Sequence, residues 1–155
     1  MSVRPVRGPD LPRTAGVRHP HRYLLHNPVM RMLARRLIAR RYAVTVRGAE
    51  HLPRQGPVIV AANHIGWLDG PLLGIVLPRP VHALTKVDMF TGRTGGFLRQ
   101  TGQIPLDRFH VDPAAIKTAL RVLRAGNAVG IFPEGTRGDG ELRRFHRGTA
   151  YLALA

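Results

Sequence analysis

A histidine and an aspartate lie close together in the segment Asn63-His64-Ile65-Gly66-Trp67-Leu68-Asp69. The Asp69 carboxylate can accept a hydrogen bond from one imidazole nitrogen of His64, which fixes the tautomer and stabilises the imidazolium. The other nitrogen can then take a proton from a hydroxyl, because the pKa of histidine lies near neutrality. No serine lies within this segment, which favours direct attack by a substrate hydroxyl over a covalent enzyme intermediate. The alternative is a loop histidine followed by a helix-capping Asp69, since eight histidines make a chance pair unsurprising.

A second polar segment, Phe132-Pro133-Glu134-Gly135-Thr136-Arg137, directly follows an apolar run. Gly135 allows a ligand to approach the backbone closely, and Arg137 offers a planar fork of donors that suits a phosphate. Glu134 can accept a hydrogen bond from a substrate hydroxyl or orient Arg137. Alone, the segment would equally fit a surface Glu–Arg pair after a strand. Together with the His–Asp pair, it indicates a base that activates a hydroxyl beside a pocket for an anionic substrate.

Two further cations are candidates for binding a phosphate. Arg108 follows a short strand-like stretch that begins at Gln103, and Lys86 follows another that begins at Val81. Arginine is so frequent in this chain that any single arginine also fits a solvated surface position.

The charge balance of the chain is strongly basic. Lys and Arg number 24 against 9 Asp and Glu, for a formal net charge of +15. Such a surface attracts polyanions, and nucleic acid and an anionic membrane are the two obvious partners. Cysteine is absent, which excludes disulfides, thiolate metal sites and cysteine nucleophiles. No apolar run reaches the length of about 18 residues that a transmembrane helix needs, so none is expected.

The N-terminal region divides into an arm and a helix. Residues 1–22 are rich in Arg and Pro and lack the apolar core of a signal peptide, so a disordered basic arm is predicted. Residues 23–42 are predicted to hold a basic amphipathic helix, with Asn27 as N-cap and Pro28 at the first helical position. Its apolar face consists of Val29, Met30, Leu33, Leu37 and Ile38. The helix fits a membrane interface, or it packs on the core with a solvated arginine face, because the periodicity is the same in both cases.

Residues 43–155 are predicted to form an α/β domain with a mixed, largely parallel sheet flanked by helices. Continuous apolar runs indicate strands at 43–46, 58–62, 81–85, 103–106 and 128–132. Helices are expected at 71–77, at 112–125 and from about 147 onward. The helix at 112–125 begins with Asp112 as its cap and ends at Gly126. Because the sequence ends inside the last helix, we expect a truncated chain whose sheet lacks late strands.

These segments, taken in order, resemble those of the glycerolipid acyltransferases of the 1-acyl-glycerol-3-phosphate acyltransferase type. Residues 63–69 look like that family's Asn-His-x4-Asp motif, residues 102–108 resemble its second block, and residues 132–137 match its third block. Residues 145–153 look like the helix that leads to the fourth block. The resemblance covers about residues 44–155. Two glycines depart from the pattern: Gly66 stands where the family often has serine, and Gly138 where a hydroxyl residue is common.

The resemblance implies that His64 is the general base and that Asp69 is its orienting partner. It also implies that Arg108, Glu134 and Gly135 bind a glycerol phosphate acceptor. Thr136 and Arg137, from the same block, and Lys86, from its position, complete the predicted acceptor site. The implied donor is an acyl thioester on coenzyme A or acyl carrier protein, and the implied product is phosphatidic acid. No metal or bound cofactor is implied.

Two other interpretations remain open at this point. The first is an acyltransferase that acts on another lysolipid or on a glycolipid, since acceptor choice depends on the shape of the pocket. The second is a non-enzymatic basic module that binds nucleic acid, although no zinc pattern, helix-turn-helix or aromatic RNA-binding signature is present. For the enzyme, we expect peripheral attachment to an anionic membrane at the cytoplasmic face of the cell.

Overall fold

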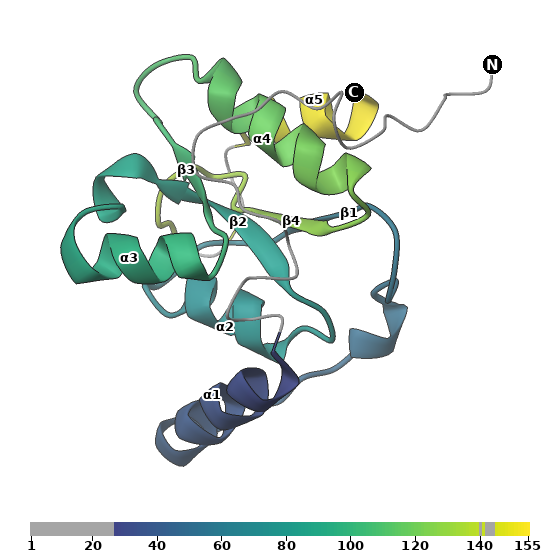
Figure 1. The fold of residues 1–155 in the computed structure, drawn as a ribbon, viewed down its shortest axis with the longest axis vertical. Helices are drawn as coiled ribbons and strands as arrows, with labels where there is room; N and C mark the ends of the chain where they lie inside the picture. The colour runs from purple at the N-terminus through teal and green to yellow at the C-terminus, as the bar shows by residue number, and fades with distance from the viewer. Residues whose placement is uncertain (1–26, 140, 142–144) are drawn as a thin grey trace.

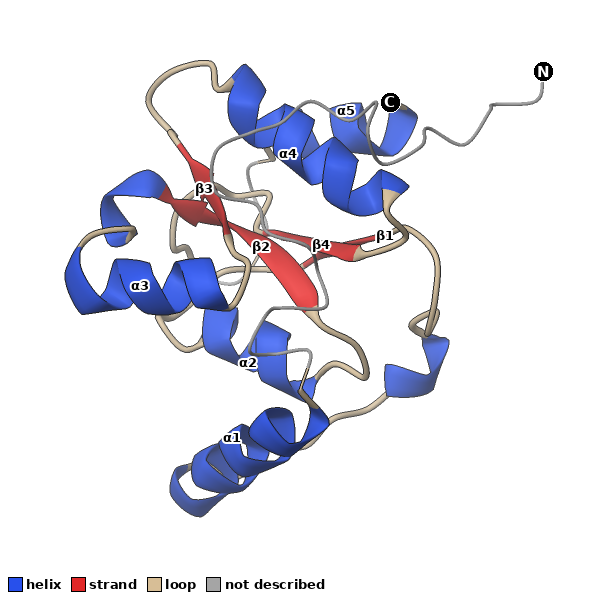
Figure 2. Ribbon diagram, viewed as in Figure 1, coloured by secondary structure: helices blue, strands red, loops and turns tan. Residues whose placement is uncertain are grey.

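The computed structural model describes residues 27–139, 141 and 145–155. The predicted arm at residues 1–22 lies outside the described residues. In the described part, four strands form one parallel sheet in the order β1-β4-β2-β3 (Figure 2). The strands are β1 (Val58–Ala61), β2 (Val81–Lys86), β3 (Ile104–Leu106) and β4 (Ala128–Ile131).

Helices cover both faces of the sheet (Figure 1). They are α1 (Pro28–Arg41), α2 (Asp69–Val76), α3 (Gly92–Gln100), α4 (Pro113–Arg124) and α5 (Gly148–Leu154). On one face α4 packs against β2, β3 and β4, and α5 packs against α4 and β1. On the other face α2 packs against β2, and α1 packs on the outer side of α2. The predicted α/β class is confirmed, and all four described strands run parallel rather than in a mixed sheet.

The main hydrophobic core lies between the sheet and the α4–α5 layer. Apolar residues recur at helical spacing along α4, so one stripe of this helix faces the sheet. The buried side chains of this core are Ile104, Ala115, Ala119, Val122, Leu123, Val129, Ile131 and Leu152. Asp112 caps α4 as predicted, because its side chain accepts the backbone N–H of Ala115.

One predicted strand is wrong. Residues 43–47 join no strand of the described sheet, and Val44 and Val46 are exposed. The apolar residues of this stretch predicted a strand, but a strand requires a neighbour for its backbone groups. These residues instead line a groove beside α1.

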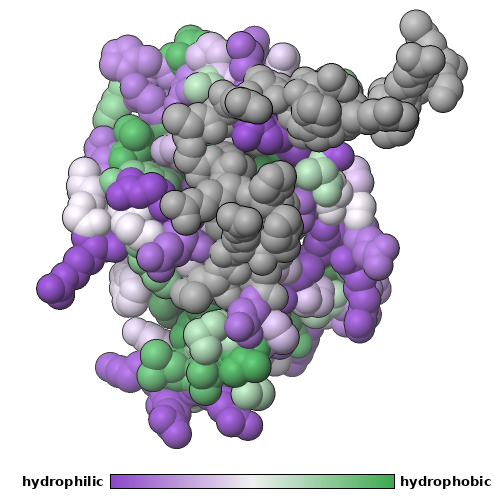
Figure 3. Space-filling view, viewed as in Figure 1, coloured by the Kyte–Doolittle hydropathy of each residue, from purple (hydrophilic) through white to green (hydrophobic). Residues whose placement is uncertain are grey.

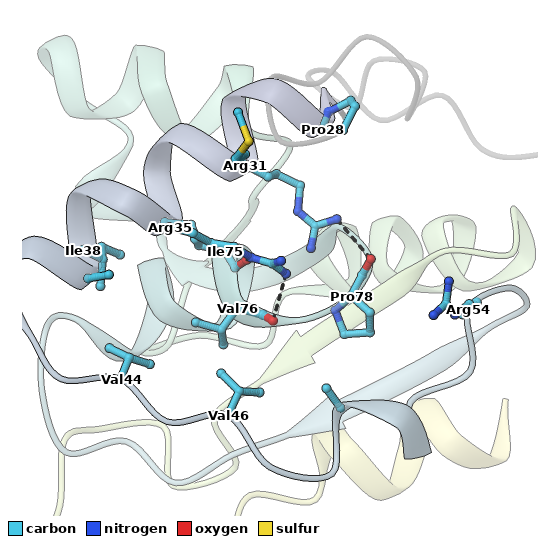
Figure 4. Close-up of a pocket in the computed structure, with 13 residues that line it drawn as sticks. Pro28, Arg31, Arg35, Ile38, Val44, Val46, Arg54, Ile75, Val76 and Pro78 are labelled. Carbon is cyan, nitrogen blue, oxygen red and sulfur yellow. Dashed lines mark hydrogen bonds between the residues drawn. The ribbon is translucent and has the colours of Figure 1, made fainter.

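Helix α1 turns two of its arginines inward. Nε of Arg35 donates to the carbonyl of Ile75 at 2.7 Å, and its Nη2 donates to Val76 at 3.0 Å. Arg31 donates to the carbonyls of Leu77 and Pro78. Figure 4 shows both side chains reaching from α1 toward the C-terminal end of α2. The last carbonyls of a helix have no partner within it and attract cations, so these bonds attach α1 to α2.

Part of the apolar surface of α1 is exposed, whereas Met30 and Ile38 are half-buried. Val29, Leu33 and Leu37 are exposed, Leu37 to 69%. Figure 3 shows this hydrophobic surface over α1 at the lower end of the molecule, bordered by hydrophilic side chains. Arg31 and Arg35 bind carbonyls at the end of α2, whereas Arg36, Arg40 and Arg41 are exposed to solvent.

Arg79 stabilises the opposite edge of the sheet, where the strands begin. Its buried guanidinium donates to the carbonyls of Pro53 at 3.1 Å, Gly56 at 2.8 Å and Gly126 at 2.6 Å. Pro53 and Gly56 precede β1, and Gly126 precedes β4. One side chain thus holds the loops that lead into two neighbouring strands.

Candidate active site

The two polar segments meet because β1 and β4 are neighbours in the sheet. Ala61 at the end of β1 is paired with Ile131 at the end of β4. His64 and Glu134 therefore lie equally far beyond paired strand ends. In open parallel sheets, ligand sites form at this carboxyl edge of the strands.

The structure brings together the two residues predicted as a base and its partner. Nδ1 of His64 lies 2.9 Å from Oδ2 of Asp69. The same oxygen accepts the backbone N–H groups of Ile65 at 2.7 Å and Gly66 at 2.8 Å. Since a carboxylate only accepts hydrogen bonds, Nδ1 carries the proton. Nε2 is then the nitrogen that can accept a hydrogen bond. The atoms nearest to the position that a Cβ would take at Gly66 are Oδ1 of Asp69 and N of Leu68, both at 4.0 Å, so the site also has room for serine.

Opposing effects set the pKa of Asp69. Partial burial raises this pKa, whereas the hydrogen bonds from Gly66, His64 and Ile65 lower it. The hydrogen bonds outweigh the burial, and the pKa lies below the ordinary value of an aspartate. Asp69 is therefore ionised at neutral pH, and its charge stabilises an imidazolium at His64.

The ring of Phe132 packs against the imidazole of His64. Its ring is stacked on the His64 ring, with centroids 4.4 Å apart and planes at 25°. This contact and the bond to Asp69 together fix the plane of the imidazole. Phe132 belongs to the predicted 132–137 segment, but its role was not predicted; its place before Glu134 was the available signal.

Glu134 makes a contact that the sequence did not predict. Its side chain is buried, with 9% exposure, and its Oε1 accepts the backbone N–H of His64 at 3.0 Å. On the other side of the same residue, the backbone N–H of Gly138 donates to the carbonyl of His64 at 2.8 Å. The segment after β4 therefore holds both backbone polar groups of His64.

Arg108 reaches the same segment from β3. Its guanidinium donates to the carbonyl of Gly135. Gly135 has φ +69°, in the left-handed region, and a Cβ there would lie 2.7 Å from the ring of His146. His146 is itself fixed, because its backbone N–H donates to the carbonyl of Pro133 at 2.8 Å. Arg108 and Gly135, both predicted as acceptor-binding residues, thus lie in direct contact.

The other predicted acceptor residues occupy the same edge of the sheet. Thr136 and Arg137 lie exposed in the loop after β4. Lys86 ends β2, forms an ion pair with Asp88, and places its Nζ 5.6 Å from the centre of the Phe109 ring. A role for these residues in binding an acceptor stays a prediction.

Exposed apolar side chains surround this edge. They follow the ends of three strands, and Trp67, the only tryptophan of the chain, is 66% exposed. The exposed residues in these loops are Ile65, Trp67, Val87, Met89, Phe109 and Val111.

The larger groove of the described structure lies elsewhere. It has a volume of about 660 Å³ and runs between α1, the 44–54 segment and the end of α2 (Figure 4). None of its lining residues belongs to the predicted site. A smaller groove of about 450 Å³ lies between α4 and α5. The candidate site is therefore indicated by side-chain geometry rather than by either of these two grooves.

The fold and the site define a class: an α/β domain with a His–Asp pair at the carboxyl edge of a parallel sheet and an arginine beside it. A family model described as Acyltransferase matches residues 43–155. The chain therefore belongs to this acyltransferase family.

Named relatives include 1-acyl-sn-glycerol-3-phosphate acyltransferase of Bacillus subtilis (strain 168). It is 37% identical over 103 residues, which cover 65% of this chain and 52% of the relative. The human 1-acyl-sn-glycerol-3-phosphate acyltransferase alpha is 36% identical over 118 residues, covering 72% of this chain and 41% of the relative. A lyso-ornithine lipid O-acyltransferase of Pseudomonas aeruginosa is 36% identical over 125 residues, covering 77% and 47%. The chain spans about half the length of these relatives.

No helix among the described residues has the length and apolarity needed to cross a membrane. Likewise, His, Asp and Glu side chains in this part of the chain form no cluster of three suited to a metal ion.

Proposed function

We propose that this chain transfers an acyl group from an acyl thioester to the free hydroxyl of 1-acyl-glycerol-3-phosphate, giving phosphatidic acid. The observation that carries the proposal is the contact between His64 and Asp69 at the edge where Arg108 meets Gly135. A proton acceptor and a phosphate-binding cation at one edge suit an acceptor that carries both a hydroxyl and a phosphate. The relatives named above support the same acceptor.

In this reaction Nε2 of His64 takes the proton of the acceptor hydroxyl as the oxygen attacks the thioester carbonyl. The new C–O bond forms, the C–S bond breaks, and the imidazolium returns its proton to the leaving thiolate. Asp69 remains ionised throughout and stabilises the imidazolium. General-base catalysis of this kind contributes about 10²–10⁴-fold to the rate. No bound cofactor is needed, because coenzyme A or acyl carrier protein enters as part of the donor substrate.

The phosphate of the acceptor would lie against Arg108, with Arg137 and Lys86 as further cations. Gly135 and Thr136, in the loop after β4, would line the phosphate site. The buried Glu134 would support this loop from inside the protein. Arg108 supports this arrangement best, because β3 delivers it directly to the loop after β4. A guanidinium can offer two parallel donors to a phosphate, which gives orientation as well as affinity.

A second acceptor is favoured by one specific observation. The Pseudomonas relative, which this chain matches at 36% identity, is named as a lyso-ornithine lipid O-acyltransferase. Such an acceptor would present a hydroxyl to His64 and make less use of Arg108. A comparison of the two acceptors therefore separates the two candidate functions.

The enzyme would work at the surface of an anionic membrane, attached peripherally at the cytoplasmic face of the cell. The exposed apolar side chains of α1 and the net charge of +15 support this proposal. Trp67 and Ile65 beside His64 would then face the lipid that contains the acceptor.

The proposal is tested by thiol release from an acyl-coenzyme A in detergent, with lysophosphatidic acid, a lyso-ornithine lipid or no acceptor. We expect release that depends on lysophosphatidic acid and is lost in His64→Ala with the circular dichroism spectrum unchanged. Native-rate release by the variant would remove His64 from the mechanism. Release only with the lyso-ornithine lipid would replace the acceptor, and a parallel assay with an acyl carrier protein donor identifies the carrier.

A further inference from the structure

Residues 132–138 contact both the backbone and the ring of His64. Oε1 of Glu134 accepts its N–H at 3.0 Å, and the N–H of Gly138 donates to its carbonyl at 2.8 Å. These two bonds lie on either side of the His64 Cα and fix the direction of the Cα–Cβ bond. Phe132 and Asp69 then fix the remaining side-chain torsions.

Glu134 and Gly138 also depend on each other. A Cβ at position 138 would lie 2.3 Å from Oε2 of Glu134, which is closer than such atoms approach. The carboxylate therefore occupies the space that any other residue at position 138 would need. Glu134 is buried, and one of its oxygens is already bonded to His64, so it has little freedom to retreat. The structure thus gives a steric reason for glycine at a position where the resemblance leads one to expect a hydroxyl residue.

We propose that Glu134 and Gly138 are coupled positioning residues that hold the backbone of His64, with the Glu134 carboxylate acting on the base rather than only on the acceptor. The expected effect of Glu134 and Gly138 on turnover rests on the proposed function. Its geometric part, the bond between Glu134 and the His64 amide, does not depend on which acceptor is used.

The proposal separates the effects of variants on kcat and on KM. In Glu134→Ala the amide of His64 loses its acceptor and the imidazole is free to move, and misplacement by about 1 Å can cost about 10²-fold in rate. We expect kcat to fall by about 10–100-fold with the acceptor KM unchanged. Glu134→Gln keeps a carbonyl oxygen in place of Oε1, so we expect a loss of less than about tenfold, because a neutral acceptor forms a weaker bond.

Gly138→Ala provides the test of coupling. In the parent chain the added methyl displaces the Glu134 carboxylate, so kcat should fall toward that of Glu134→Ala. In the Glu134→Ala background the same substitution meets no carboxylate and should cost no more than about twofold, since coupled sites are not additive. Gly96→Ala is the matched control, because a Cβ on this α3 glycine meets nothing within 4 Å. It should leave kcat unchanged.

Amide hydrogen exchange measured by NMR gives a readout that does not require turnover. The amide of His64 should be protected in the parent chain and in Glu134→Gln, and should exchange at least about tenfold faster in Glu134→Ala. Equal exchange in all three would overturn the proposal. A raised acceptor KM with unchanged kcat in Glu134→Ala, or additive losses in the double variant, would also overturn it. If no acceptor is acylated by the parent chain, the proposed function fails, and the exchange data alone decide whether Glu134 holds His64.

Discussion

Oδ2 of Asp69 bonds at once to Nδ1 of His64 and to two backbone N–H groups of the loop between them. A single carboxylate oxygen therefore joins the two ends of the loop from His64 to Asp69 and orients the imidazole. Because Asp69 is also the first residue of α2, the loop is attached to a helix that packs on β2. The base is thus positioned by regular secondary structure rather than by a free loop, which favours a preorganised site.

Acid should weaken the fold through Asp69. Its pKa in the folded chain is below that of the unfolded chain, which is about 3.9. A carboxyl whose pKa is depressed by folding stabilises the fold above the unfolded pKa, and this stabilisation is lost as the pH falls through the lower folded value. We expect the difference in unfolding free energy between the parent chain and Asp69→Asn to be constant above about pH 5 and to shrink below about pH 4.

Urea unfolding at a series of pH values measures this difference. Asp107, whose pKa is lowered chiefly by its hydrogen bond with His110, titrates in both proteins and cancels in the comparison. A difference that does not change with pH would show that the ionised Asp69 is not preferentially stabilised in the folded chain.

Removal of Arg108 should weaken acceptor binding. Arg108→Ala should raise the KM for a phosphorylated acceptor by about tenfold with a smaller effect on kcat, because a charge-assisted bond to the phosphate is lost. Arg108→Lys should recover part of the loss, since it keeps the charge without the planar fork. Initial rates against acceptor concentration measure both constants.

The control for Arg108 is Arg124→Ala, which removes an exposed arginine at the far end of α4. An equal change of KM in both variants would mean that Arg108 contributes only to the overall charge.

The outer face of α1 should bind lipid through its leucines. Replacement of Leu33 or Leu37 by Gln should weaken binding to anionic vesicles by about tenfold each, since each leucine contributes apolar area that lipid would cover. Leu154→Gln removes an even more exposed leucine, at 89% exposure, from α5 and should leave binding unchanged. Vesicle sedimentation gives the affinity, and the single tryptophan, Trp67, reports by its emission whether the catalytic edge enters the lipid. Equal binding by all variants would place the contact elsewhere.

Arg79 should matter for stability and not for chemistry. Arg79→Leu leaves three backbone carbonyls without their donor and should lower the free energy of unfolding by about 1–3 kcal/mol. The measurement is urea unfolding at neutral pH, with the exposed Arg54→Leu as the control. A variant as stable as the parent chain would show that water replaces the guanidinium without cost.

The sequence predicted those helices and strands whose ends are marked by residues within or next to the element itself. Asn27, Asp112 and Gly126 mark helix ends that the structure places within a residue or two of the expected positions. The apolar runs at 58–62, 81–85 and 128–132 become β1, β2 and β4 because each is flanked by a helix or glycine that limits its length. The contact between His64 and Asp69 follows from spacing, since a turn of this length returns a side chain to its own loop.

Contacts between segments that are distant in the sequence could not be predicted from it. The bond between Glu134 and the His64 amide depends on β1 and β4 being neighbours, and strand order cannot be read from local patterns. The strand expected at 43–46 failed for a related reason, since its pattern was correct but no partner lies beside it. The inward direction of Arg31 and Arg35 depends on the position of α2, which no periodicity within α1 reports.

Helix α2 is held at both ends by side chains with different tasks. At its first residue the Asp69 carboxylate holds the base, and at its last turn Arg31 and Arg35 bind the carbonyls. Its eight residues form a rod about 12 Å long, at about 1.5 Å per residue. Such a rod is a spacer of fixed length, so α2 sets the distance between the α1 contacts and the His64 imidazole.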